Sequence, residues 1–141
     1  MAYCTQDDLL KLVPEGELAQ LTTESGEVPD SAVVSEAVAK AEAEIDAYLA
    51  VRYVLPLAEV PARVKSLAVD MALYYLYVRR SVAPEVRRQA YEDAVAFLKL
   101  VGAGRAEIVG AAGAEVSGDA QDVTEISSAE RVFDRTKMSG W

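Results

Sequence analysis

The side chains that could do chemistry in this chain are few, and they form no recognisable catalytic pattern. Histidine is absent from the 141 residues, which removes the commonest general base and the commonest zinc ligand. The single cysteine, Cys4, has no histidine to activate its thiol and no second cysteine for a disulfide or a CxxC metal site. We therefore expect a protein of the reducing cytosol in which Cys4 is a small, partly buried structural residue.

The acidic residues and the glycines also favour structural roles. The pairs 7–8 and 92–93 are consecutive acids, whose side chains on a helix point about 100 degrees apart, so they indicate solvated faces. Asp70 is the one acid inside an apolar stretch, and we expect it to have a partner on a neighbouring helix, with an arginine of the central segment as the candidate, rather than a catalytic role. Gly102 and Gly104 follow an expected helix rather than a strand, which indicates a helix stop. These patterns predict no enzyme activity, no cofactor and no metal.

Charge is segregated along the chain. Residues 1–50 carry two basic and eleven acidic side chains, residues 51–105 carry nine and five, and residues 106–141 carry three and seven. Complementary acidic and basic flanks favour association between copies and set their register. The net charge of -9 argues against nucleic acid as the main partner, because phosphate binding usually needs a basic face.

Four arginines form a concentrated basic corner. Arg79 and Arg80 end one expected helix, whereas Arg87 and Arg88 begin the next. Cations are favourable at a helix C-terminus, which explains the first pair, but the second pair lies at the wrong end of its helix for this effect. We predict that the corner contacts the acidic half of a neighbouring copy.

Apolar periodicity predicts an all-α, compact domain of four or five helices. Thr5, with an acid three residues later, resembles a capping box for a short first helix, and a second short helical turn is expected over residues 15–21. Apolar residues at three- and four-residue spacing predict a helix over about 31–50. Proline suits the first turn of a helix, and Pro61 and Pro84 are placed to open two more.

These two further helices are expected over about 62–80 and 84–101, and the first of them should be the central core helix because it is apolar on most sides. The side chains expected to be largely buried are Ile45, Leu49, Leu67, Met71, Tyr74, Phe97 and Leu98. The side chains of the last helix expected to face inward are Val86, Ala90, Ala94, Phe97, Leu98 and Val101.

Residues 106–141 have a different character and are expected to form a long, partly extended C-terminal arm on a helical domain of residues 1–105. Three glycines fall among residues 106–118, and helical periodicity is weak. The large apolar side chains are concentrated at the end, in Val132, Phe133, Met138 and Trp141. They can fold back on their own domain or dock on a neighbour. We predict that the arm becomes ordered only against a partner. Phe133, Met138 and Trp141 therefore join the four arginines as candidate partner-binding residues.

Several stretches resemble the Mu-like phage neck family. They are the opening MAYCTQDDL at residues 1–9, EIDAYLAVRYVLPL at residues 44–57, and the Val-Pro pair at residues 60–61 that precedes a tyrosine-rich helix. The resemblance covers residues 1–103 and returns around residues 131–141. The stretch at 44–57 is its most specific part.

This resemblance implies a subunit related to the head-tail connector, or adaptor, proteins of long-tailed phages, which form a ring, commonly twelve-fold, between portal and tail. The implied partners are further copies of the chain, the portal protein, a tail-proximal neck protein, and genomic DNA that passes through the lumen without sequence-specific binding. The implied location is the virion neck, after synthesis in the host bacterial cytoplasm, with no membrane partner. A tail terminator or stopper of the neck, and a small helical phage-encoded binding or regulatory protein, stay open as alternatives.

Overall fold

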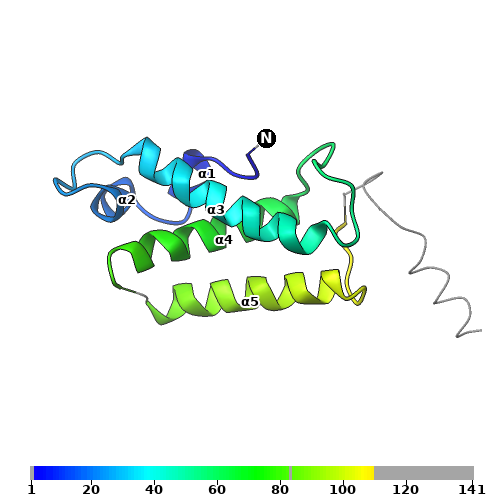
Figure 1. Ribbon diagram of the computed structural model, residues 1–141. Helices are drawn as coiled ribbons and strands as arrows, with labels where there is room; N and C mark the ends of the chain where they lie inside the picture. The colour runs from blue at the N-terminus through cyan, green and yellow to red at the C-terminus, as the bar shows by residue number, and fades with distance from the viewer. Residues whose placement is uncertain (1, 83, 110–141) are drawn as a thin grey trace, which may run out of the picture.

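The computed structural model describes residues 2–82 and 84–109, and these residues form five helices without a strand (Figure 1). The all-α fold class is confirmed. The helices are α1 (Gln6–Leu10), α2 (Glu15–Thr22), α3 (Ser31–Leu49), α4 (Ala62–Arg79) and α5 (Glu85–Gly102). The predictions for Phe133, Met138, Trp141 and the rest of the arm from residue 110 onward lie outside the described residues.

The helix starts follow from capping groups that the sequence contains. The capping box at α1 is present, because the Asp8 amide donates to Thr5 Oγ1 at 3.4 Å and the Thr5 amide donates to Asp8 Oδ2 at 2.9 Å. Asp30 caps α3 by accepting from the Ala32 amide at 2.9 Å. Pro61 and Pro84 immediately precede α4 and α5, where the absence of an amide proton costs no helical hydrogen bond.

Helix α4 is the centre of the bundle. It packs against each of the other four helices and runs between α3 and α5 (Figure 1). Its buried residues point to several sides of the helix, including Leu67, Ala72 and Leu73, which agrees with the predicted central core helix. Among the residues that the structure describes, no helix is both long enough and apolar enough to cross a membrane.

Most of the predicted core is confirmed. Five of the seven side chains predicted to be largely buried are at most 1% exposed: Ile45, Leu49, Leu67, Met71 and Leu98. Tyr74 and Phe97 are only half-buried. They lie at the margin of the core, where the Tyr74 ring stacks on Tyr91 with centroids 4.4 Å apart and the Arg63 guanidinium lies 4.5 Å from the centre of the Phe97 ring.

The inward face of α5 is correct in its middle and wrong at its start. Ala94, Leu98 and Val101 are buried, but Ala90 is half-buried and Val86 is 74% exposed. The apolar stripe runs along one side of the helix, but its first member, Val86, lies in the first turn after the α4–α5 connection and its side chain stays exposed. Periodicity indicates which side of a helix is apolar but not how far along the helix a neighbour reaches.

Past the end of α5, the chain turns back onto the loop between α3 and α4. The Ile108 amide donates to the Tyr53 hydroxyl at 3.0 Å, and the Ile108 side chain is 5% exposed. Gly104 has a φ of +82°, and a Cβ at this position would lie 2.7 Å from Arg52 Nη1. Glycine therefore permits both the turn and the close approach of the guanidinium.

Candidate interaction surfaces

Arg79 and Arg80, the first half of the predicted basic corner, bind the C-terminal end of α2. Arg79 Nη1 donates to the Leu21 carbonyl at 3.0 Å, and Arg80 donates to the carbonyls of Gln20 and Thr23 at 3.1 and 3.2 Å. The last carbonyls of a helix have no partner within the helix and carry partial negative charge. Both arginines therefore cap a helix that is distant in sequence, as well as ending their own.

The second pair behaves differently. Arg88 is paired within α5, with Glu85 and with Glu92, and these carboxylates raise the pKa of its guanidinium, Glu85 more than Glu92. Arg87 lies over the Tyr77 ring at 5.9 Å and makes no salt bridge to a described residue. Arg79 also makes no salt bridge to a described residue, so Arg79 and Arg87 are the two arginines of the corner whose charges have no carboxylate partner there.

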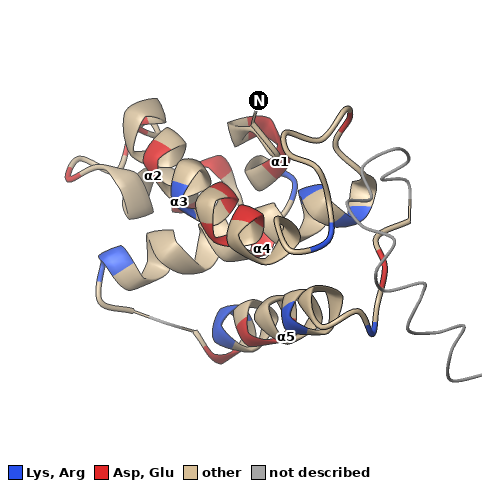
Figure 2. Cartoon of the chain, turned by 45° about the vertical axis from the view of Figure 1, so that its right-hand side comes forward, with Lys and Arg blue, Asp and Glu red and all other residues tan. Residues whose placement is uncertain are grey.

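Exposed valines accompany these arginines. Val78, Val82 and Val86 are 45%, 50% and 74% exposed, and they span the end of α4, the turn and the start of α5. We call residues 78–88 the basic corner. In Figure 2 the ribbon is blue, the colour of lysine and arginine, on both helices that flank this turn. An apolar centre beside cationic groups is the composition expected of a surface that binds an acidic partner.

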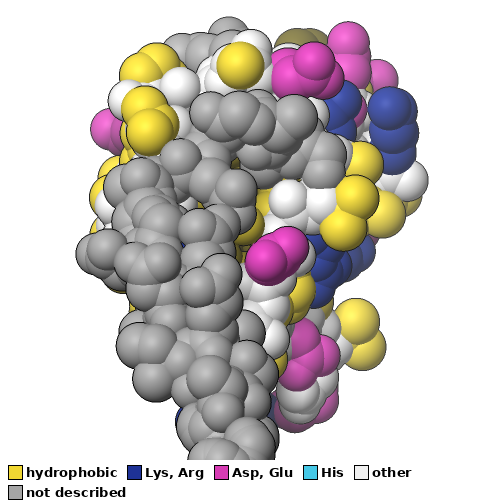
Figure 3. Space-filling view, turned by 90° about the vertical axis from the view of Figure 1, so that its right-hand side faces the viewer, with side chains coloured by type: hydrophobic (Ala, Val, Ile, Leu, Met, Phe, Trp, Pro, Cys, Tyr) yellow, Lys and Arg dark blue, Asp and Glu magenta, His cyan; other side chains and the backbone are white. Residues whose placement is uncertain are grey.

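The opposite end of the bundle carries scattered apolar side chains. Val51 and Val54 are 60% and 56% exposed, and Val109 is 88% exposed. Figure 3 faces this end and shows hydrophobic side chains separated by charged and other polar ones over the described surface. Single exposed valines are ordinary in soluble proteins, so this end offers a weaker case for binding than the basic corner.

The acids of α3 are partly engaged by tyrosines. The Tyr3 hydroxyl donates to Asp46, the Tyr75 hydroxyl donates to Glu44, and the Tyr91 hydroxyl donates to Glu44 at 3.1 Å. Burial, followed by the bond to Glu44, raises the pKa of Tyr75, so this hydroxyl stays protonated as a donor. These bonds tie the N-terminal segment, α4 and α5 to α3. Over residues 1–50 as a whole, several other acidic side chains are exposed: Asp7, Glu15, Glu24, Glu27, Asp30 and Glu36.

Cys4 is buried and Asp70 is half-buried, and burial shifts the pKa of both side chains. Cys4 is 2% exposed, and burial, followed by the nearby Asp8, raises the pKa of its thiol to about 12, so it is a neutral thiol at neutral pH. Burial also raises the pKa of Asp70, against the opposing effects of Arg87 and Arg63. Within the described residues Asp70 makes no direct ion pair, so the predicted arginine partners act at longer range. No group of three acidic or cysteine side chains there is arranged to hold a metal ion.

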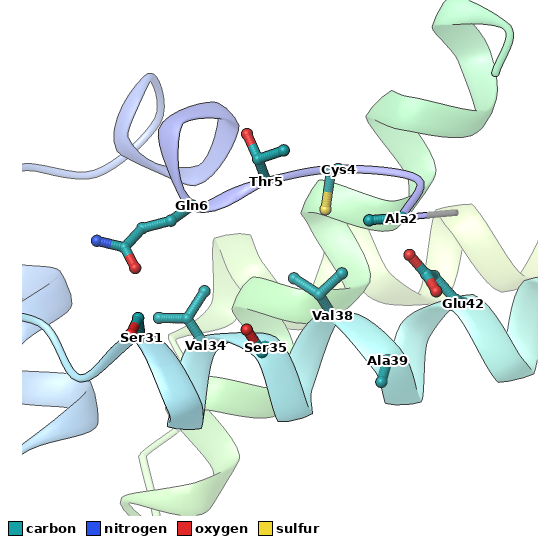
Figure 4. Close-up of a pocket in the computed structure, with 10 residues that line it drawn as sticks. All are labelled: Ala2, Cys4, Thr5, Gln6, Ser31, Val34, Ser35, Val38, Ala39 and Glu42. Carbon is teal, nitrogen blue, oxygen red and sulfur yellow. The ribbon is translucent and has the colours of Figure 1, made fainter. Parts of the chain in front are cut away.

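A hollow lies between the N-terminal segment and α3 (Figure 4). Its volume is about 460 Å³. Val34 and Val38 project from α3 towards the segment, and the Cys4 side chain projects back towards α3 (Figure 4). We call it the α3 hollow. Most of the side chains that line it are small, so they do not fill the space between the N-terminal segment and α3. The sequence did not predict this hollow, because it forms between segments about thirty residues apart.

The carboxylate of Asp8 gives a pH-dependent prediction. The Thr5 amide, then the Thr5 hydroxyl, Lys65 and Lys11 hold its pKa below the ordinary value. A folded-state pKa below the unfolded one means that Asp8 stabilises the fold above the unfolded pKa, about 3.9, and that this contribution disappears as pH falls through the folded value. Asp8→Asn should cost about 1 kcal/mol at pH 7, judged from typical helix caps.

Thermal unfolding at neutral and at acidic pH checks this prediction. The difference in free energy of unfolding between the wild type and Asp8→Asn should shrink in acid. Asp7→Asn is the matched control, because Asp7 is exposed in the same helical turn. A difference between wild type and Asp8→Asn that is the same at both pH values would contradict the role of the ionised carboxylate.

Comparison with known proteins shows the family. The model of the bacteriophage Mu Gp36 family matches residues 3–125. The chain is 35% identical to gene product J of Escherichia phage Mu over 144 residues, which covers 100% of this chain and 99% of the other. It is 31% identical to the Mu-like prophage FluMu protein gp36 of Haemophilus influenzae over 140 residues, which covers 99% and 97%. This chain therefore belongs to the bacteriophage Mu Gp36 family.

Proposed function

We propose that this protein is a structural subunit of the virion neck, a head-tail connector (adaptor) that forms a ring between portal and tail. The match to a Mu phage family over residues 3–125 supports a phage role, and similarity along the whole length of gene product J supports one for the entire chain. The observation that carries the proposal is the basic corner. Its exposed valines and Arg87 are suited to bind an acidic surface.

The acidic surface proposed as its partner is the N-terminal half of the next copy. Residues 1–50 have a net charge of -9, whereas residues 51–105 have a net charge of +4. Contact between the corner of one copy and the acidic half of the next is heterologous, and heterologous contacts close into a ring when the rotation between copies permits. Repetition of this contact around a ring would complete the connector, with the portal on one side and a tail-proximal neck protein on the other.

Charge reversal at the corner tests the subunit contact. Arg87→Glu and Arg88→Glu together should weaken assembly at least tenfold, because they replace attraction to the acidic half with repulsion. The monomer should stay folded with a loss of less than about 1 kcal/mol, since exposed ion pairs contribute little. Arg79 and Arg80 are unsuitable for this test because they also cap α2.

Analytical ultracentrifugation as a function of salt measures the effect on assembly. Lys99→Glu is the control, because Lys99 is exposed on the same helix but outside the corner. Assembly that is indifferent to salt and to the Arg87 and Arg88 reversal would rule out this interface.

Electron microscopy of the purified protein mixed with the portal protein of its phage tests the function itself. A ring seated on the portal supports the connector. A ring that binds the tail tube instead supports a tail terminator or stopper. If the protein stays monomeric, does not bind the portal and binds a host protein instead, its function is regulatory and the proposal is contradicted.

A further inference from the structure

We infer that the α3 hollow receives residues 131–141 of a neighbouring copy. This inference rests on the proposed function, because it requires that copies assemble. It adds a second contact between subunits, formed at the hollow between the N-terminal segment and α3.

The shape of the α3 hollow suits a large side chain. Its volume is about 460 Å³, and Ser35 and Ala39 of α3 line it beside Ala2 of the N-terminal segment. Val34 and Val38 add apolar surface between these small residues (Figure 4). A hollow of small and apolar side chains can bury an aromatic ring, and burial of aromatic rings dominates the energetics of many interfaces.

The charge of the α3 hollow favours a cationic occupant. Glu42 is the charged residue in its lining, and neither lysine nor arginine lines it. Asp46 follows one turn later on the same helix, and Asp30 is exposed at the helix start. A peptide that brings both large apolar and basic side chains is therefore complementary to this surface.

Residues 131–141 are the part of the chain beyond the described residues with that composition. They contain three basic side chains and one acidic side chain, together with Val132, Phe133, Met138 and Trp141. Residues 110–130 contain five acidic and no basic side chains, so the acidic half would repel them. Charge complementarity thus selects the last eleven residues as the occupant.

Reach and the proposed interface point to a neighbouring copy as the source. The basic corner of the neighbour meets this acidic half, and the C-terminal end of its α5 lies about 27 Å from that corner, because α5 has 18 residues. The 21 residues from 110 to 130 can span up to about 70 Å when extended. The segment that joins α5 of the neighbour to its last residues is therefore long enough for those residues to reach the hollow.

Fluorescence of Trp141, the single tryptophan of the chain, reports its burial directly. In the assembled wild type its emission should be shifted to shorter wavelength, and dilution to monomers should abolish the shift. Ala39→Arg should also abolish the shift, because the new side chain fills the hollow and repels the basic segment. Ala47→Arg is the matched control: it makes the same charge change at another exposed alanine of α3, one that does not line the hollow, and should keep the shift.

A mixing experiment identifies which copy supplies the segment. The donor carries Ala39→Arg and keeps Trp141, whereas the acceptor keeps its hollow and carries Phe133→Ala and Trp141→Ala. Neither chain alone should give a shifted emission, but the mixture should give one. The donor alone should lack the shift in Trp141 emission. If mixing with the acceptor fails to restore that shift, a neighbouring copy is not the source of the segment, and the segment docks within its own chain.

Sedimentation of the same samples separates this inference from the proposed function. Assembled wild type with unshifted Trp141 emission, or a shifted emission that Ala39→Arg leaves unchanged, overturns the inference while the assembly proposal stands. A wild type that stays monomeric at all concentrations and on the portal overturns the proposed function instead.

Discussion

Deletion of residues 127–141 is expected to abolish the joining of heads to tails while leaving the helical domain folded. The five helices of the described residues and the buried core, which extends to Ile108, lie within residues 2–109, so the deletion leaves all of these elements in the chain. The free energy of unfolding should change by less than about 0.5 kcal/mol, as for other changes away from packed features. Joining should fail because the deletion removes Phe133, Met138 and Trp141 together.

Circular dichroism, thermal unfolding and an in vitro head-tail joining assay measure the two parts of this result. A full-length chain with Phe133→Ala and Trp141→Ala serves as a second variant, because it keeps the length of the arm and loses the large aromatic side chains. It should impair joining nearly as strongly as the deletion. If the deletion unfolds the domain, residues 127–141 belong to the core and the arm is not an assembly element.

Met71→Ala should cost about 2–5 kcal/mol of stability. Met71 is completely buried in α4, the helix that contacts all four others, so truncation leaves a cavity that the surrounding helices can fill only in part. Typical domains of this size gain only about 5–15 kcal/mol from folding, so the loss is a large fraction of the total.

Urea unfolding, at a concentration where the chain is monomeric, gives the loss from the change in midpoint. The melting temperature should fall by several degrees for each kcal/mol lost, about 4–8 °C for a domain near 100 residues. Val78→Ala is the control, because Val78 lies on the same helix and is 45% exposed. An unchanged midpoint for Met71→Ala would remove this residue from the core.

The helices themselves could be predicted because their signals are local. The Thr5 cap, the prolines before α4 and α5, and the apolar stripe of α3 each act through residues a few positions away. A capping bond or a three-to-four-residue spacing is therefore complete within a short stretch of sequence. The central position of α4 could be predicted as well, because a short stretch of sequence shows that its apolar residues lie on several sides of the helix.

The assignment of the charged side chains was decided by the tertiary structure. Arg79 and Arg80 cap α2 although about sixty residues separate them from it, and Glu44 of α3 accepts from tyrosines of α4 and α5. Sequence can show that a side chain is charged, but its partner depends on how the helices cross. The same holds for Val86, which belongs to an apolar stripe visible in the sequence but is exposed in the structure.

The sequence by itself determined the helical class, most helix positions, the centre of the core and the division of the chain into acidic and basic parts. Only the tertiary structure decided that Arg80 and Arg88 have carboxylate partners within the described residues while Arg79 and Arg87 have none, and that a hollow opens between the N-terminal segment and α3. The physical reason is the distance along the sequence over which the interactions act. Helix formation and net charge are set by neighbours in sequence, whereas surfaces and hollows arise where segments far apart in the sequence come to lie side by side.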